Sequence, residues 1–130
     1  MVEVVRELVA HEAIDASAFR GIGVSGQQHG SVFLDAGGNV VRAAKLWCDT
    51  STADDARTLS DEVGRPIPVG FTASKVRWLA RVEPEQWSLC SSVILPHDFV
   101  NFRLTGRLVT ESGDASGTGY CGVHTRTWDA

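Results

Sequence analysis

The sequence has little of what several classes of protein require. Its 130 residues include only three cysteines, Cys48, Cys90 and Cys121, which lie far apart and form no C-x-x-C pair. This pattern favours free thiols in a reducing compartment over a disulfide framework. No apolar run approaches the roughly 20 residues that span a bilayer. The first seven residues carry acids and no long apolar run, so we expect no signal peptide and a cytoplasmic protein.

Basic clusters and metal-binding spacings are also missing. Twelve Lys and Arg residues stand against sixteen Asp and Glu residues, which gives a formal net charge of −4. The arginines are scattered, so neither nucleic acid nor an anionic membrane surface is expected as a partner. The four histidines show no i, i+4 pairing with a Glu between them, so no metal site is indicated.

The composition that remains, 43% hydrophobic and 22% charged residues, is ordinary for one globular domain that buries a core. Residues 4–13 show helical periodicity, with Val4 and Leu8 on the face expected to be buried. The glycine-bounded apolar residues 21–24 predict a buried strand, and the turn at 36–39 predicts a hairpin between the runs on either side of it.

The remaining expected elements alternate along the chain in an α/β manner. Helices are expected at 51–63, 73–82, 97–104, in a short stretch from Pro84 and at an opening near 127; strands are expected at 31–35, 40–42, 91–95 and 108–111.

The stretch from Ser25 to Gly30 carries the most chemistry. Gln28 and His29 follow the first predicted strand and offer donors and acceptors for neighbouring hydroxyls of a sugar. Gly26 and Gly30 allow the backbone to turn and to approach a ligand closely. The alternative interpretation is that His29 is an ordinary hydrogen-bonded loop residue, which is the commoner role for a single histidine at the end of a strand.

Four segments, taken in order, resemble the FGGY family of carbohydrate kinases, and its xylulokinase branch in particular. These segments cover most of residues 20–130 and are Gly23–Gly30, Leu46–Thr50, Gly70–Leu79, and Leu95–Gly106 followed by Asp114–Tyr120. The resemblance implies an actin-like, ribonuclease H-like α/β fold. The chain would be an incomplete N-terminal, sugar-binding domain that spans residues 1–130 and lacks its first strands.

The resemblance also implies a function. The whole enzyme would transfer the γ-phosphoryl group of ATP, with Mg²⁺, to the 5-hydroxyl of D-xylulose, and a homodimer would be an acceptable assembly. Gln28 and His29 would hold the sugar hydroxyls, while Trp47 and Asp49 would line the sugar pocket. Lys75 belongs to the family's signature helix.

Each of these residues also has a plainer interpretation. Trp47 could be part of the core, Asp49 could support the start of the following helix, and Lys75 could be a solvated or salt-bridged lysine. Asp98 is expected to support the first turn of its own helix and to bind no ligand. Cys48 and Ser51 replace the Asn and Arg of the family's W-N-D-x-R segment.

Two family motifs are not found in the sequence, the D-x-G-T phosphate loop and the G-G-x-D segment that carries the catalytic aspartate. Because phosphoryl transfer needs a phosphate cradle, a metal and a base, we assign no catalytic, cofactor-binding or metal-binding residue here and expect the chain to be inactive alone. The alternatives are another kinase of the family, acting on ribulose, gluconate or glycerol, and a non-catalytic sugar-binding module.

Overall fold

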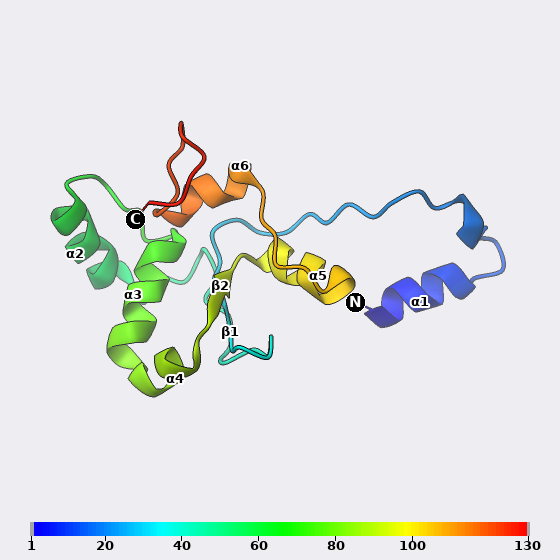
Figure 1. The fold of residues 1–130 in the computed structure, drawn as a ribbon, viewed down its shortest axis with the longest axis horizontal. Helices are drawn as coiled ribbons and strands as arrows, with labels where there is room; N and C mark the ends of the chain where they lie inside the picture. The colour runs from blue at the N-terminus through cyan, green and yellow to red at the C-terminus, as the bar shows by residue number, and fades with distance from the viewer. Residues whose placement is uncertain (1, 130) are drawn as a thin grey trace.

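The computed structural model describes residues 2–129. Most of its elements gather around one small antiparallel sheet, while the N-terminal helix lies to one side at the end of a long connecting segment (Figure 1). In chain order the elements are α1 (Val2–Ala10), the 3-10 helix η1 (Ala16–Ala18), β1 (Val32–Leu34), α2 (Ala53–Val63), α3 (Thr72–Val82), α4 (Pro84–Leu89), β2 (Ser92–Ile94), α5 (Pro96–Thr105), α6 (Ser112–Ala115) and the 3-10 helix η2 (Ser116–Thr118). None of the described helices is long and apolar enough to cross a membrane.

The core is built on β1, whose three residues are all buried. β1 pairs with β2 in an antiparallel register that sets Phe33 opposite Val93. Phe33 and Leu34 are fully buried, as is Leu79 of α3, and Leu95, which directly follows β2, is nearly so. The mixed α/β class expected from the sequence is therefore confirmed.

Helix prediction was accurate to within a few residues where each helix packs on the rest of the chain. α3 begins one residue before the expected start, and α5 ends where Gly106 adopts the left-handed conformation with φ +72° that favours glycine. The side chain of Thr52, which precedes α2, makes no cap and instead shares a hydrogen bond with the Ser74 hydroxyl.

The predicted strand at 21–24 does not form within the described residues. This stretch belongs to a long connecting segment that joins η1 to the main body (Figure 1), and Ile22 is 64% exposed. A strand is stable only when its backbone groups pair with a neighbouring strand, and no such ladder is formed by residues 21–24 in this part of the chain.

The predicted burial of α1 was also wrong. Val4 and Leu8 are exposed, because α1 lies apart from the other helices and from the sheet (Figure 1). The periodicity of an amphipathic helix shows which face is apolar but does not show which surface covers that face.

The predicted hairpin forms only in part. The turn is closed by Asp35, whose carboxylate accepts hydrogen bonds from the backbone of Gly37 and Asn39. Beyond the turn only isolated bridges form, one between Leu34 and Val40. No strand is described at 108–111, and the residues near 127 form a bridge between Cys121 and Trp128 instead of a helix.

Candidate functional site

A small cavity joins two of the segments singled out in the sequence. It has a volume of about 280 Å³ and is lined by Gly26, Gln27, Gln28, His29 and Trp47. Three of the four predicted sugar-binding residues are thus brought together. Asp49, the fourth, lies outside this lining.

His29 is held in an uncommon backbone conformation. Its φ angle is +55°, in the left-handed region that non-glycine residues seldom adopt. The backbone N–H of His29 donates to Asp114 Oδ1 at 3.1 Å, and its carbonyl accepts from Thr72 Oγ1 at 3.3 Å. Such conformations cost of order 1–3 kcal/mol and persist only where their surroundings fix them, often at ligand sites.

The His29 ring is enclosed on several sides. Its centroid lies 5.1 Å from that of Phe71, and its Nδ1 lies 2.8 Å from Asp114 Oδ1. Gly117 packs so closely that a Cβ atom there would overlap the imidazole. The orientation of the ring is therefore set by its neighbours before any ligand arrives.

The backbone of the Gly26–Gly30 turn also lies tightly against the start of α5. A Cβ atom on Gly26 would come within 2.9 Å of His97 Cβ, and one on Gly30 within 2.6 Å of Pro96 Cγ. Glycine is needed at both positions because neither neighbour is the mobile end of a flexible side chain.

Trp47 also lines the cavity and is not a core residue, since it is 55% exposed. Its loop is fastened to α3 by Lys45, a buried lysine whose ammonium lies 3.7 Å from the centroid of the Trp78 ring. The same ammonium donates to Asp49 Oδ2 at 3.0 Å and to Ser51 Oγ at 2.7 Å. Lys45 was not singled out in the sequence.

Asp49 organises this loop. Its Oδ1 accepts from the backbone N–H of Ser51 at 2.9 Å, and its Oδ2 accepts from Lys45. The hydrogen bonds from Ser51, and then the one from Lys45, hold the pKa of Asp49 far below its ordinary value. The carboxylate is therefore ionised at neutral pH. Its bond to Ser51 fits the plainer interpretation, in which Asp49 supports the chain just before α2.

Lys75 is neither solvated nor salt-bridged, so the plainer expectation for it was wrong. Its side chain is fully buried, and its Nζ donates to the carbonyl oxygens of Val69, Gly70 and Phe71 at 2.8 to 3.2 Å. Lys75 thus fixes the turn that precedes α3. Phe71, at the end of that turn, places its ring beside His29. Burial lowers its pKa from 10.5 to about 8.

This burial predicts a pH dependence of stability. Between pH 8 and 10.5 the unfolded chain binds more protons at Lys75 than the folded chain, so the free energy of unfolding rises with pH in that window. At about 1.4 kcal/mol per pH unit the rise reaches about 3 kcal/mol. Urea unfolding of the wild type and of a Lys75→Met variant across this window measures it. A variant that shows the same rise as the wild type would contradict the assignment to Lys75.

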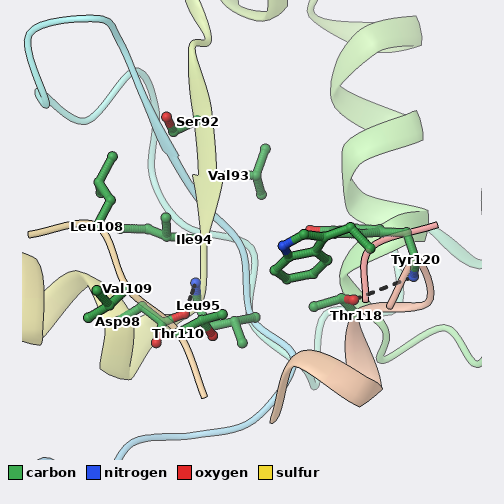
Figure 2. Close-up of a pocket in the computed structure, with 11 residues that line it drawn as sticks. Ser92, Val93, Ile94, Leu95, Asp98, Leu108, Val109, Thr110, Thr118 and Tyr120 are labelled. Atoms are coloured by element: carbon green, nitrogen blue, oxygen red, sulfur yellow. Dashed lines mark hydrogen bonds between the residues drawn. The ribbon is translucent and has the colours of Figure 1, made fainter. Parts of the chain in front are cut away.

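A larger cavity, of about 460 Å³, lies beside β2 and away from the predicted sugar-binding residues. Figure 2 shows Leu108, Val109 and Ile94 on one side of it and Thr118 and Tyr120 on the other. Asp98 lies at its base and accepts a hydrogen bond from the backbone N–H of Leu95 at 3.3 Å, which confirms that Asp98 supports the first turn of α5.

Asp114 and His97 also lie at the site; both belong to segments of the family resemblance, but neither was named as a sugar-binding residue from the sequence. Asp114, on α6, contacts both the backbone and the ring of His29, and its Oδ2 lies 3.3 Å from His97 Nδ1. The signal was present in the sequence as an Asp within a run of small residues, but its contact with a residue 85 positions away requires the fold.

Among residues 2–129 no three potential ligands gather to hold a metal ion.

The mixed α/β fold and the polar and aromatic cavity are compatible with the family that the sequence resembles, and a comparison with protein families identifies that family. The model for the N-terminal domain of the FGGY family of carbohydrate kinases matches residues 1–130. The chain therefore belongs to that family, and the resemblance seen in its four segments is confirmed.

Curated relatives of this chain include several xylulose kinases. The chain is 43% identical over 119 residues to the xylulose kinase of Haemophilus influenzae, which covers 84% of this chain and 24% of that protein. It is 41% identical over 130 residues to that of Streptomyces rubiginosus, with 92% and 26% covered. The chain thus spans about a quarter of the length of these curated relatives.

Solved structures show the same similarity. A crystal structure described as a xyloylose kinase from Brucella ovis matches 97% of this chain and 28% of its own, with a TM-score of 0.89 and 35% identity. Xylulose kinase from Rhodospirillum rubrum matches 89% of this chain and 26% of its own, with a TM-score of 0.80 and 28% identity.

Proposed function

We propose that this chain supplies the sugar-binding part of an ATP-dependent kinase that phosphorylates the 5-hydroxyl of D-xylulose. The observation that carries the proposal is the cavity in which Gln28, His29 and Trp47 meet, with His29 held in a left-handed conformation at its edge. The names of the relatives, which are xylulose kinases, support the choice of sugar.

The chemistry of the cavity suits a small polyol. Gln28 offers an amide donor and an acceptor, and His29 offers a ring nitrogen, so the two can bind adjacent hydroxyls. The exposed face of Trp47 can pack on the C–H groups of a sugar, which an aromatic ring does at little entropic cost. Asp49 stays in the proposal as a residue that shapes the loop and retains free lone pairs for a hydroxyl.

We assign to this chain no residue that binds ATP or Mg²⁺ or that accepts the proton of the hydroxyl. Those parts of the reaction would come from portions of the relatives outside the quarter that this chain matches. In this proposal residues 1–130 form part of an N-terminal domain, and the kinase acts in the cytoplasm, where its free thiols Cys48, Cys90 and Cys121 remain reduced.

The sugar assignment is tested by calorimetric titration of the chain with D-xylulose. We expect Trp47→Ala to weaken binding about five- to ten-fold, because it removes about 1 kcal/mol of aromatic packing. Trp87→Ala, on α4 and outside the cavity, is the matched control and should bind as the wild type does. Equal losses in both variants, or no binding of D-xylulose, would contradict the proposal.

A second substrate is tested in the same titration, because one similar solved structure is described as a gluconate kinase from Lactobacillus acidophilus, with 26% identity and a TM-score of 0.72. Binding of D-gluconate in preference to D-xylulose would move the proposal to that substrate. D-Ribulose and glycerol complete the series.

The chain alone is expected to release no ADP from MgATP and D-xylulose, because the phosphate cradle and the base are not assigned to it. A coupled assay for ADP release measures this, with a complete xylulose kinase as the positive control. Steady ADP release by the purified chain, dependent on D-xylulose, would overturn this division of roles.

A further inference from the structure

His29 stands at one end of a row of four ionisable side chains from three parts of the chain. Its Nδ1 lies 2.8 Å from Asp114 Oδ1, and the other oxygen of Asp114 lies 3.3 Å from His97 Nδ1. The second nitrogen of His97, Nε2, lies 3.0 Å from Asp98 Oδ1. The row therefore runs from the cavity, through α6, to the first turn of α5.

The row is largely withdrawn from water. Asp114 is 6% exposed and Asp98 is 3% exposed, and the His97 side chain is 12% exposed. A buried carboxylate needs a cation or hydrogen-bond donors to offset its lost hydration. Asp114 has the backbone N–H of His29 and lies between two imidazoles, so these rings are the groups that can compensate its charge.

The contacts restrict where the protons can lie. No hydrogen bond of good geometry joins either ring to Asp114, and His29 Nδ1 is buried without one. An unprotonated ring nitrogen 2.8 Å from a carboxylate oxygen would set two lone pairs against each other, so this contact favours hydrogen on the ring nitrogen that faces Asp114. In His29 this nitrogen is Nδ1. A neutral imidazole that carries its hydrogen on Nδ1 has an unprotonated Nε2, which is an acceptor.

His97 completes the arrangement because its Nδ1 lies 3.3 Å from Asp114 Oδ2, on the side of the carboxylate away from the His29 contact. Among the described residues, the groups that face the His97 ring are the carboxylates of Asp98, on its own helix, and Asp114, on α6. Glu111, whose side chain caps the start of α6, adds a further negative charge near His97.

We propose that Asp114, held in place by His97, is a positioning residue that fixes His29 as the Nδ1–H tautomer and leaves Nε2 to accept a hydrogen bond from a sugar hydroxyl. The part that concerns the sugar rests on the proposed function, whereas the tautomer is a property of the chain itself. With Nε2 unprotonated, His29 binds a ligand hydroxyl that donates a hydrogen bond to it. Gln28, beside it, can either donate a hydrogen bond to the neighbouring hydroxyl or accept one from it.

The tautomer can be measured directly. Long-range ¹H–¹⁵N correlation spectra of the ¹⁵N-labelled chain distinguish protonated from unprotonated ring nitrogens, and the chain has only four histidines. His29→Gln assigns the His29 signals by their loss. We expect the wild type to show hydrogen on His29 Nδ1 and none on Nε2 at neutral pH.

Variants then test the row. Asp114→Asn is expected to move His29 toward the Nε2–H tautomer and to weaken D-xylulose binding about ten-fold. His97→Gln should give a smaller change of the same kind, and His97→Lys, which places a cation next to Asp114, should give a smaller change than His97→Gln. His124→Gln, an exposed histidine outside the row, is the matched control and should change neither measurement.

The outcomes separate the two proposals. Hydrogen on Nε2 of His29 in the wild type, or a tautomer that neither Asp114→Asn nor His97→Gln changes, overturns the inference even if the sugar binds. The expected tautomer with no sugar binding supports the positioning role and contradicts the proposed function. The wild-type spectrum alone decides the tautomer, so a variant that fails to fold does not remove the test.

Discussion

Alanine in place of Gly117 is expected to remove most sugar binding while the secondary structure is kept. The added Cβ atom would overlap the His29 ring at Cε1 and Nδ1, so the imidazole must leave its position between Gly117 and Phe71. It would then lose its contact with Asp114 and its place at the cavity. A displaced hydrogen-bonding group costs about 1–3 kcal/mol, which corresponds to an affinity about ten- to hundred-fold lower.

The matched control for this prediction is Gly23→Ala. Gly23 lies on the segment that leads to the same turn, but a Cβ atom there would meet nothing within 4 Å. Titration with D-xylulose, together with circular dichroism of both variants, compares them. Unchanged binding in Gly117→Ala would mean that the His29 ring does not contribute to the sugar site.

Truncation of Phe33 to alanine is expected to have the largest effect on stability. Phe33 is the middle residue of β1, fully buried and opposite Val93 of β2. Replacing a buried phenylalanine by alanine costs about 3–5 kcal/mol, because transfer free energy is lost and a cavity remains. Since small domains are stable by about 5–15 kcal/mol, this loss would consume much of the total.

Urea unfolding measures this loss, and Phe19→Ala supplies the control. Phe19 is 47% exposed on the segment before the main body, so its truncation should change the free energy of unfolding by less than about 0.5 kcal/mol. Similar losses in the two variants would show that β1 is not the centre of the core.

The sequence predicted the packed helices well because their signals are local. Pro96 at the first position of α5 and Gly106 after its last residue are independent of the rest of the fold. The segment at 21–24 was predicted to be a strand for an equally local reason, but a strand also needs a partner, which a local pattern does not supply. β1, at residues 32–34, forms its ladder with β2, some sixty residues further on, and not with the segment just after the turn at 36–39.

The candidate site divides in the same way. Gln28, His29 and Trp47 could be named from the sequence because their side-chain chemistry suits a sugar and the surrounding motifs resemble a family. Asp114 could not be placed beside His29, because that contact depends on how α6 is set against the turn. Lys75 was misjudged because a lysine that donates to three backbone carbonyls is rare and leaves no pattern in the sequence.

The turn that carries His29 and the loop that carries Trp47, which together line the small cavity, both contact the beginning of α3 and the residues just before it. Thr72 holds the carbonyl of His29, Phe71 lies against its ring, and Gly70 approaches the carbonyl oxygen of Trp47 so closely that a Cβ atom there would come within 3.3 Å of it. A ligand that enters this space does not have to immobilise two separate loops. The conformational entropy of the binding surfaces has already been lost on folding, so a greater share of each new contact remains as affinity for a ligand of few atoms.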